Sequence, residues 1–412
     1  MNIYQFTVKD RFLKYVKYDT QSDENSKTKP STEKQLIFAR ELLSELNELG
    51  IDASMDEYGY IYAIIPSNTD KQVPPIGFMA HIDTAPAISG TNVKPLVHEN
   101  YQGGNITLPK DNQIITTADN QKLHDLKGND IITSDGSTLL GADDKAGVAS
   151  IMDAINYLVT HPHIKHGDIM IAFTVDEEIG AGLDNFDLKK FGAKYAYTLD
   201  GGDVGEVEFE TFNADSISIK IYGRNIHSGY AKDKMINAIK IAAEFIEKLP
   251  KDRWCPEKTS EREGFVHVDL IEGLEDSCIV RIRVRDFDEK KLIEYEHRLK
   301  EFIAESIFNH PGSRYEFEIS EQYRNPKSIM DKHPQIQEYT LEAMRRIGIK
   351  PEIKPVRGGT DGCKLSFMGI PTPNLFCGEH NFHSRTEWVS VQEMEAAVRT
   401  IVEICKVWEE KS

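Results

Sequence analysis

The pattern of helices and strands along the chain changes twice, and this change constrains the fold more than any single motif. Before about residue 205, apolar runs of strand length alternate with segments of helical spacing. That order is typical of an α/β domain with a largely parallel sheet. From residue 206, the sequence EVEFETFNADSISIKIYG alternates apolar and polar residues with period two, as half-buried antiparallel strands do. After residue 326 the helix–strand pattern returns.

The simplest interpretation is one domain interrupted by another. Residues 1–207 and 327–412 are predicted to form an α/β catalytic domain with a mostly parallel central sheet. Residues 208–326 are predicted to form an inserted α+β domain of strands and two helices. A chain of 412 residues has room for this arrangement, since domains average roughly 150 residues.

Charge and composition exclude several classes of partner. The net charge of −18 argues against nucleic acid and anionic membranes, because both bind basic surfaces. No stretch approaches about 18 consecutive apolar residues, so no membrane span is expected. The N-terminal residues also lack the apolar core and cleavage site of a signal peptide. The five cysteines, Cys377 among them, form no CxxC pair and are expected to be free thiols, which predicts a cytoplasmic protein.

Imidazole and carboxylate side chains recur where the predicted strands end. They are His81 and Asp83 in GFMAHIDTAP, Asp143 and Asp144 in GADDKAG, Glu177 and Glu178 in TVDEEIG, Asp200 in YTLDGG, and His380 and His383 in CGEHNFHSRTEW. The carboxyl ends of parallel strands face one crevice, where ligands bind. Each residue alone has an ordinary structural explanation, such as a helix N-cap or a solvated edge. Together they predict a divalent metal site, and zinc accepts such nitrogen and oxygen ligands.

A metal would also explain the three consecutive acids in TVDEEIG, which run from Asp176 to Glu178 at the end of a predicted core strand. Adjacent carboxylates repel one another, and burial raises the cost of keeping them ionised. The charge of a bound cation would allow neighbouring carboxylates to remain ionised.

The order and spacing of these motifs resemble those of the M20 family of co-catalytic zinc metallopeptidases. The resemblance covers nearly the whole chain, including the inserted domain, and rests on ADDKAG, LDGG, RGGTDG and a late FH. Within that family the motifs are most similar to those of tripeptide aminopeptidases. The resemblance therefore implies a zinc-peptidase-like catalytic domain, two Zn²⁺ ions per subunit and tripeptide substrates.

The resemblance also implies a role for each residue of the predicted metal site. His81 and Asp200 would bind one zinc ion, and Glu178 and His383 would bind the other. Asp143 would bridge the two ions, because a carboxylate has two oxygens to offer.

Two choices between neighbouring residues follow from the family pattern. Asp143 is preferred to Asp144 because the bridging ligand is the first Asp of the ADD turn. His383 is preferred to His380 because it lies four residues before Glu387, as the family's ligand precedes its glutamate.

Two further acids are expected to act on catalysis without binding the metals. Glu177 would be the general base, which takes a proton from water and later gives it to the leaving amine. Asp83 would accept the second ring N–H of His81 and thereby fix the orientation of the ring.

Three residues are predicted to contact the substrate. His227, in NIHSGY of the inserted domain, would contact the substrate or the transition state; the alternative is a helix-start turn. Arg285, in RIRVRD, would bind the terminal carboxylate of the peptide; the alternative is a salt-bridged strand face. Arg357, in the Gly-rich RGGTDG, is the second candidate for that carboxylate, since the segment lacks the ending of a phosphate loop. The resemblance also implies that the inserted domain is of a lid or dimerisation type, so a homodimer is considered.

The leading hypothesis is a zinc-dependent aminopeptidase that removes the N-terminal residue from tripeptides. Another M20 amidohydrolase, such as a dipeptidase or an N-acyl amino acid deacylase, would share the metal site and differ in its pocket walls. A non-catalytic metal-binding protein is the alternative from a different class. That alternative predicts loss of the base or of a ligand, yet Glu177 and all the ligand candidates are present.

Overall fold

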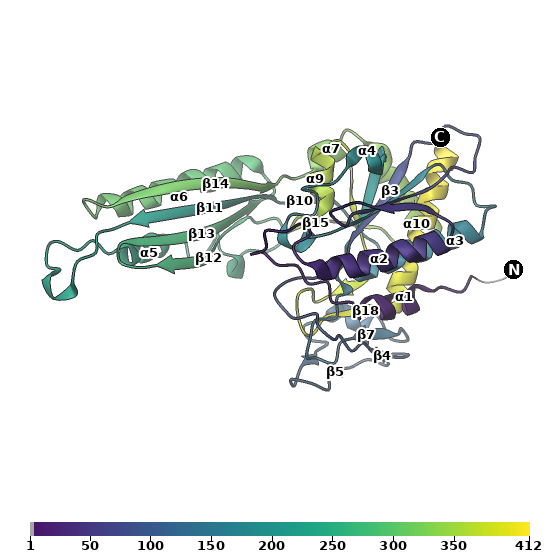
Figure 1. The fold of residues 1–412 in the computed structure, drawn as a ribbon, viewed down its shortest axis with the longest axis horizontal. Helices are drawn as coiled ribbons and strands as arrows, with labels where there is room; N and C mark the ends of the chain where they lie inside the picture. Colours follow the sequence, from purple (N-terminus) through teal and green to yellow (C-terminus); the bar gives the residue numbers. More distant parts are fainter. Residues whose placement is uncertain (1–3) are drawn as a thin grey trace. The chain divides into compact units, whose positions relative to one another are not determined.

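The computed structural model describes residues 4–412, which divide into two compact units (Figure 1). Unit 1 contains the chain up to Phe209 together with Ser328–Lys354 and Thr360–Ser412. Unit 2 contains Glu210–Lys327 and the short segment Pro355–Gly359.

The segment Pro355–Gly359 belongs to unit 2, whereas the sequence pattern assigns it to the catalytic domain. The carbonyl oxygen of Val356 accepts a hydrogen bond of 3.1 Å from the backbone N–H of Phe212. The guanidinium of Arg357 donates to the main-chain oxygen of Glu263 at 2.7 Å. These bonds join residues far apart in sequence, so the local pattern of the segment does not reveal them.

Unit 1 is built on a mixed sheet. Within the described residues this sheet has eight strands in the order β1-β2-β8-β3-β9-β16-β10-β15. The strands are β1 (Asp52–Met55), β2 (Ile61–Ile65), β3 (Ile76–His81), β8 (Ile169–Thr174), β9 (Tyr195–Leu199), β10 (Glu206–Thr211), β15 (Glu352–Val356) and β16 (Asn374–Leu375). Neighbours from β8 through β3 and β9 to β16 are parallel, whereas the pairs β1–β2, β2–β8 and β10–β16 are antiparallel. The predicted α/β class is confirmed, and the parallel pairing occupies the centre of the sheet.

Helices cover this sheet and enclose the main core of unit 1. They are α1 (Val8–Tyr15), α2 (Glu33–Glu48), α3 (Ala142–Thr160), α4 (Leu188–Phe191), α8 (Pro334–Arg346), α9 (Asp361–Phe367) and α10 (Val391–Lys411), with the single turn α7 (Lys327–Met330) at the boundary between units. Helix α3 packs on β3 and β9 and against α10. Most of its residues are buried, which explains why its sequence is apolar on nearly every face. As the sequence predicts, α2 ends beside Gly50, whose φ of 74° suits a helix stop.

Two small sheets complete unit 1 in the region from residue 90 to 135 and near residue 385. One has the order β17-β18-β7-β4, and the other pairs β5 with β6. The strands are β4 (Leu96–His98), β5 (Ile106–Thr107), β6 (Ile114–Ile115), β7 (Ile131–Thr133), β17 (Glu379–His380) and β18 (Trp388–Ser390). The pairing of β18 with β7 holds the loop between β17 and β18 against the body of unit 1.

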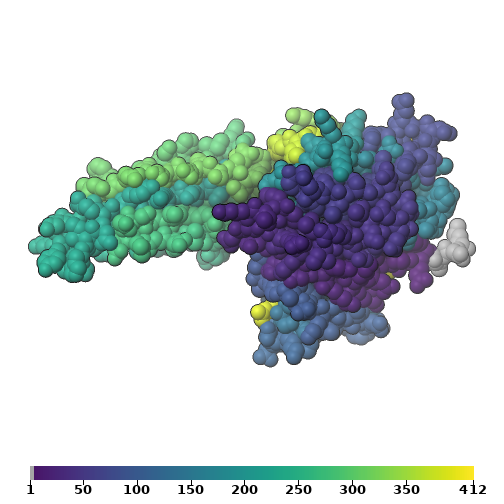
Figure 2. Space-filling model, viewed as in Figure 1, coloured from purple at the N-terminus to yellow at the C-terminus, as the bar shows by residue number. Residues whose placement is uncertain are grey.

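Helix α1 is attached to α3 by a buried carboxylate. Asp153, in the middle of α3, accepts hydrogen bonds from the backbone N–H groups of Thr7 and Val8 at 3.0 and 3.1 Å and from the Thr7 hydroxyl at 2.7 Å. An anion at a helix N-terminus satisfies the free N–H groups there and is favoured by the helix dipole. The chain from residue 4 onward therefore forms part of the surface of unit 1, purple in Figure 2.

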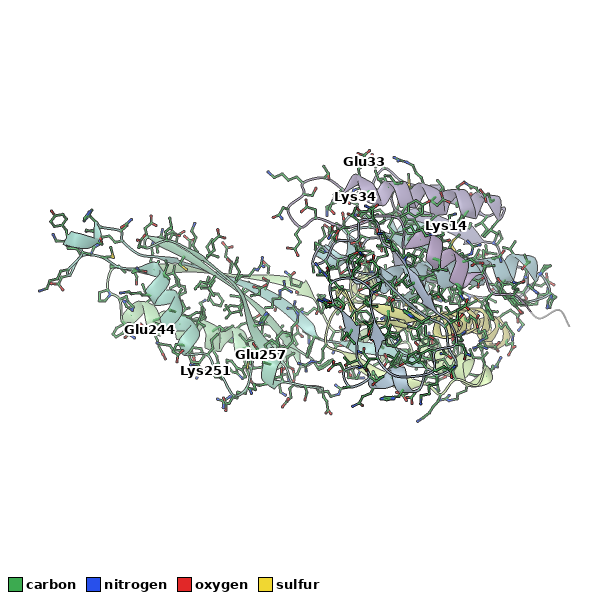
Figure 3. All side chains as sticks on the ribbon, turned by 90° about the horizontal axis from the view of Figure 1, so that it is seen from below. Lys14, Glu33, Lys34, Glu244, Lys251 and Glu257 are labelled. Carbon is green, nitrogen blue, oxygen red and sulfur yellow. The ribbon has the colours of Figure 1, made fainter. Side chains whose placement is uncertain are left out.

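Unit 2 is a two-layer α+β structure. Its antiparallel sheet has the order β12-β13-β11-β14, and α5 and α6 pack on one face of it. The elements are β11 (Asn213–Tyr222), α5 (Ala238–Glu247), β12 (Phe265–Gly273), β13 (Ser277–Asp286), α6 (Glu289–Phe308) and β14 (Arg314–Tyr323). Buried and exposed residues alternate along β11 and β13, which confirms the period-two signal. Charged side chains such as Glu244 and Lys251 of this unit are labelled in Figure 3.

Two other observations bear on the sequence analysis. No helix within residues 4–412 combines the length and the apolar composition needed to cross a membrane. All five cysteines, which lie in this range, carry free thiols. Cys377 is fully buried, and burial raises the pKa of its thiol.

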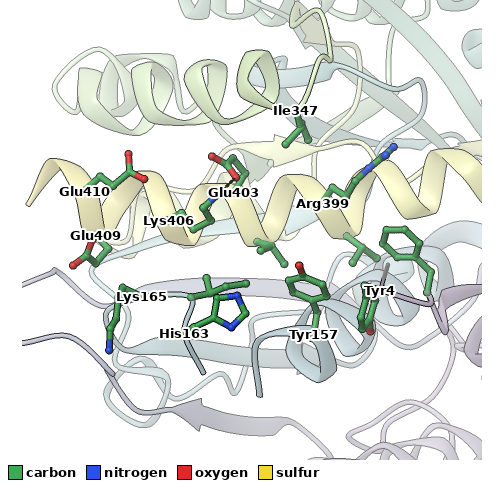
Figure 4. A pocket seen from close by; sticks show the side chains of 14 residues that line it. Tyr4, Tyr157, His163, Lys165, Ile347, Arg399, Glu403, Lys406, Glu409 and Glu410 are labelled. Atoms are coloured by element: carbon green, nitrogen blue, oxygen red, sulfur yellow. Dashed lines mark hydrogen bonds and ion pairs between the residues drawn. The ribbon is translucent and has the colours of Figure 1, made fainter. Parts of the chain in front are cut away.

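A cavity of about 810 Å³ lies along α10 in unit 1 (Figure 4). Aromatic side chains such as Tyr4 and Tyr157 form part of its lining, and Arg399 and Glu403 reach it from α10. The Glu403 carboxylate accepts a hydrogen bond from the ammonium group of Lys406, on the next turn of the helix. None of the residues that the sequence predicts to be catalytic or metal-binding lines this cavity.

Gly147 of α3 is a critical contact between helix and sheet. A Cβ atom at this position would lie 1.9 Å from the carbonyl oxygen of Leu199 in β9 and 2.2 Å from Oδ1 of Asp144. Gly147→Ala should therefore lower the thermal unfolding temperature by several degrees, since overpacking costs about 1–3 kcal/mol or more. Gly358→Ala is the control, because its Cβ would meet only a Val356 methyl group at 3.9 Å. Equal melting temperatures for the two variants in calorimetry would contradict the prediction.

Candidate metal centre

The predicted metal ligands lie at the carboxyl ends of three adjacent parallel strands and in two neighbouring segments. His81 is the last residue of β3, Asp200 directly follows β9, and Glu178 lies just beyond β8. Asp143 is in the first turn of α3, and His383 is in the loop between β17 and β18. Since β8, β3 and β9 are neighbours in the sheet, their ends meet at one edge.

The structure brings all of these side chains together around Asp143. Nε2 of His81 lies 2.9 Å from Oδ1 of Asp143, and Nε2 of His383 lies 3.0 Å from Oδ2. Nε2 of His383 is also 2.8 Å from Glu178, and Nε2 of His81 is 3.9 Å from Asp200. Each oxygen of the Asp143 carboxylate therefore faces a different imidazole. His383 is 47% exposed, so solvent reaches the centre on its side.

Burial makes it costly to keep the carboxylates of this cluster ionised. It raises the pKa of Glu178 to about 8 and that of Asp200 to about 7, in both cases with a further contribution from the charge on Asp143. Hydrogen bonds from His383 and His81 outweigh the burial of Asp143 and hold the pKa of that carboxyl below its usual value. Hydrogen bonds to Asp143 and Glu178 raise the pKa of His383 to about 11. The carboxylates would thus be stabilised by a nearby cation.

The donor set fits a divalent metal ion. His81, Asp143 and Glu178 offer ligand atoms that all lie within 4.8 Å of one another, and His81 and Asp200 belong to a second such group with Asp144. Oε1 of Glu178 is buried and has no hydrogen-bond partner within residues 4–412. A buried carboxylate oxygen without a partner is costly unless an ion takes that place. Imidazole nitrogen and carboxylate oxygen are ligands that zinc accepts.

Asp83 supports two parts of the centre at once. Its main-chain oxygen lies 3.1 Å from Nδ1 of His81, and its carboxylate lies 3.4 Å from the same atom. The two carboxylate oxygens also accept hydrogen bonds from the backbone N–H groups of Glu177 and Glu178, at 3.0 and 3.2 Å. The sequence predicts the contact with His81, whereas the bonds to the acidic turn depend on the packing of β3 beside β8.

The three consecutive acids have three different environments. Asp176, with a φ of 59°, accepts hydrogen bonds of 2.6 Å from the Ser31 N–H and from the Gln35 amide. It is therefore held by the start of α2 rather than by the centre. Glu178 contacts His383. Glu177 lies between Asp176 and Glu178 in the chain. The repulsion expected from three adjacent acids is reduced because the first is bonded elsewhere.

Glu177 is joined to the residues of the centre through its backbone N–H, which donates to the Asp83 carboxylate at 3.0 Å. Burial is the main cause of a large increase in its pKa, and the nearby carboxylate of Asp361 adds to it. Asp361, from the RGGTDG segment, is itself buried and accepts a hydrogen bond of 2.8 Å from the Thr174 hydroxyl. Burial and the carboxylate of Asp361 thus favour the protonated form of Glu177. Asp361 is not among the site residues predicted from the sequence.

The neighbouring acid and histidine make other contacts. Both oxygens of Asp144 accept backbone N–H groups, from His81 and from Gly147, each at 3.1 Å. His380 is directed to Glu393, with a ring nitrogen 2.9 Å from its carboxylate. These contacts are consistent with the choice of Asp143 and His383 as ligands, which stays a prediction.

Two buried glutamates near the centre are absent from the predicted site. Glu379 is 1% exposed, and its Oε2 has no hydrogen-bond partner within residues 4–412. Burial is the main cause of its raised pKa, and the charges of Asp143 and Asp200 raise the pKa further. It lines a cavity of about 590 Å³ together with Gly202 and other residues. Glu387 accepts backbone hydrogen bonds from the turn that carries Asp143. Glu379 lies four residues before His383, and Glu387 lies four residues after it. This proximity to a predicted ligand is the sequence signal that could have identified both glutamates.

Comparison with known proteins identifies the family. Residues 136–407 match the sequence model of peptidase family M20/M25/M40. Peptidase T of Caldanaerobacter subterraneus is 49% identical over 407 residues, which cover 98% of this chain and 99% of that protein. The chain belongs to the M20/M25/M40 family.

Solved structures agree with this assignment. The crystal structure of aminopeptidase PepT from Bacillus cereus superposes with a TM-score of 0.75 at 26% identity, and 98% of each chain is covered. A tripeptidase from Staphylococcus aureus has a TM-score of 0.76 at 22% identity and the same coverage, which shows a common fold. The M20 assignment makes the chain a peptidase with a metal centre, and the described cluster supplies the candidate ligands.

The three predicted substrate contacts are residues of unit 2 of this M20 protein. His227 is exposed, and its Nδ1 accepts a hydrogen bond of 3.2 Å from the N–H of Gly229. The guanidinium of Arg285 donates to the main-chain oxygen of Asp215 at 3.1 Å. Arg357 donates to carbonyl oxygens of its own unit, as described above. Contact of these residues with substrate stays a prediction.

Lys145 of the GADDKAG motif is a buried cation next to the centre. It is 1% exposed, and its ammonium group donates to the main-chain oxygen of Tyr18 at 2.7 Å. Burial lowers the pKa of Lys145 to about 7.

This shift predicts a pH dependence of stability in the metal-free protein. An unfolded lysine titrates near 10.4, so between pH 7 and 10 the unfolded chain binds more protons than the folded one, and wild-type stability gains from each rise in pH. Lys145→Met removes the titratable ammonium group and with it this pH-dependent contribution to stability. The free energy of unfolding of the variant minus that of the wild type should therefore decrease from pH 7 to pH 10, measured by urea denaturation after chelation. Lys17→Met, at an exposed position, is the control. A difference that stays constant with pH would contradict the prediction.

Proposed function

We propose that the protein is a zinc-dependent aminopeptidase that removes the N-terminal residue from tripeptides. The observation that carries the proposal is the Asp143 carboxylate, with one imidazole on each oxygen, in a chain 49% identical to a Peptidase T. The tripeptide class rests on the resemblance of the motifs to tripeptide aminopeptidases. It is supported by the shared fold of the Staphylococcus tripeptidase.

The residues present fit two zinc ions. His81 and Asp200 would hold one ion, Glu178 and His383 the other, and Asp143 would bridge them with its two oxygens. When bound, a pair of such ions lowers the pKa of a coordinated water and polarises the substrate carbonyl.

The contacts of His81 support this assignment. Its Nδ1 donates to the main-chain oxygen of Asp83, so Nε2 is the nitrogen that would bind a metal after it gives up the proton it shares with Asp143. The hydrogen bonds that the Asp83 carboxylate accepts from the N–H groups of Glu177 and Glu178 hold the base and a ligand in fixed relation to the ring.

Glu177 acts as the general base of the proposed reaction. It takes a proton from the attacking water and gives it to the leaving amine of the cleaved peptide bond. Its raised pKa, which burial and Asp361 produce, allows it to hold that proton between the two events.

Unit 2 supplies the proposed substrate contacts. His227 would donate to the carbonyl oxygen as negative charge develops on it. Arg285 and Arg357 would bind the terminal carboxylate, for which the planar guanidinium is suited. We further propose a lid or dimerisation role for this unit, a homodimer and a cytoplasmic location; free thiols are consistent with the last.

Glu177→Gln should separate metal binding from catalysis. The variant should retain the wild-type metal content, because the ligands are unchanged, and should lose at least 100-fold in kcat, since a general base contributes about 10²–10⁴. Metal content is measured by mass spectrometry and kcat with a tripeptide. Glu33→Gln, at an exposed position on α2, is the control. A variant that keeps a tenth of wild-type activity would exclude Glu177 as the base.

A substrate panel tests the reaction itself. Zinc-loaded protein is incubated with dipeptides, tripeptides, tetrapeptides and N-acetylated tripeptides, and the products are identified by mass. We expect release of the N-terminal residue from tripeptides and little reaction with acetylated ones. Cleavage of N-acetylated and free peptides at equal rates would contradict an aminopeptidase and favour a deacylase of the same family.

A further inference from the structure

Glu387 is buried directly beneath the turn that carries the bridging aspartate. It is 1% exposed. Its Oε2 accepts hydrogen bonds from the backbone N–H groups of Leu140 and Gly141, at 2.7 and 2.8 Å. Its Oε1 accepts the N–H of Asp143 at 3.1 Å. One carboxylate thus receives three main-chain donors from the four residues that end at Asp143.

The turn needs an acceptor from elsewhere. The N–H groups of Leu140 and Gly141 precede α3, and Gly141, at the N-cap with a φ of 81°, offers no side chain to accept the N–H of Asp143 in the first turn. These groups are buried, and an unpaired buried N–H costs about 1–3 kcal/mol. Glu387 supplies the missing acceptors from a segment more than 240 residues later in the chain.

The same loop reaches Asp143 twice. His383 approaches its Oδ2 at 3.0 Å, and Glu387, four residues later, binds its backbone N–H. The loop therefore fixes both the main chain and the side chain of Asp143.

We propose that Glu387 is a positioning residue, which holds the turn of Asp143 so that both oxygens of that carboxylate face the two metal positions. The inference rests on the metal centre of the proposed function. Partners behind metal ligands typically change metal affinity or activity by about 10- to 100-fold when they are replaced.

Two substitutions separate acceptor chemistry from shape. Glu387→Gln keeps the size of the side chain, but it replaces one acceptor oxygen with an NH₂ group that faces backbone donors. Glu387→Asp keeps both oxygens on a side chain one methylene shorter, so it should restore part of the function.

Asp153 provides a matched control on the same helix. It is also fully buried, and it accepts four donors: the hydroxyls of Tyr4 and Thr7 and the backbone N–H groups of Thr7 and Val8. It lies ten residues beyond Asp143 in the sequence, on the other side of the kink that α3 makes at Asp143 and Asp144. Asp153→Asn should therefore loosen α1 and leave the metal positions intact.

The experiment measures amide hydrogen exchange in metal-free protein and zinc affinity by chelator competition. In Glu387→Gln we expect exchange within residues 138–147 to become at least tenfold faster while β3 is unchanged. Zinc affinity should fall about 10- to 100-fold. Glu387→Asp should lie between this variant and the wild type. Asp153→Asn should exchange faster only within residues 4–15 and bind zinc as the wild type does.

Two outcomes would overturn the proposal. One is wild-type zinc affinity or wild-type exchange of residues 138–147 in Glu387→Gln. The other is faster exchange throughout unit 1, which would make Glu387 a residue of general stability. Neither measurement requires turnover, so a wild-type protein that cleaves no tripeptide would refute the proposed function and leave this result intact.

Discussion

The centre of this protein depends on one shared carboxylate. Asp143 presents one oxygen to His81 and the other to His383, at 2.9 and 3.0 Å, and these two residues come from opposite ends of the chain. The other acids gather around this pair despite their mutual repulsion and the cost of burial. The orientation of Asp143 therefore decides whether the remaining side chains form a metal centre or only a cluster of unfavourable charges.

Backbone N–H groups hold three other acids around the centre in place. Asp83 binds the turn of Glu177 and Glu178, Glu387 binds the turn of Asp143, and Asp144 binds the start of its own helix. Bonds of this kind fix a carboxylate without neutralising it. The M20 assignment gives the acids that these bonds hold a catalytic purpose.

Much of the architecture could be predicted from local sequence. Strand-length apolar runs followed by His81 and Asp200 placed both residues at one edge of the sheet, and the period-two pattern marked the sheet of unit 2. The antiparallel pairs β2–β8 and β10–β16 could not be predicted in the same way. A buried strand reads as apolar in either direction, so strand direction depends on the connections between strands and not on composition.

The sequence by itself determined the chemistry: which imidazoles and carboxylates end strands, and which family the motifs resemble. The tertiary structure decided which of these side chains has which contacts, and therefore which role each can have. It directed Asp176 to Ser31 and Gln35, paired His380 with Glu393, and placed Asp361 and Glu387 beside residues far away in the chain. The physical reason is that a carboxylate becomes a ligand, a base or a structural acceptor only through the donors that surround it. In a folded chain, those donors come from segments far away in the sequence, and the local sequence around a carboxylate does not show which segments these are.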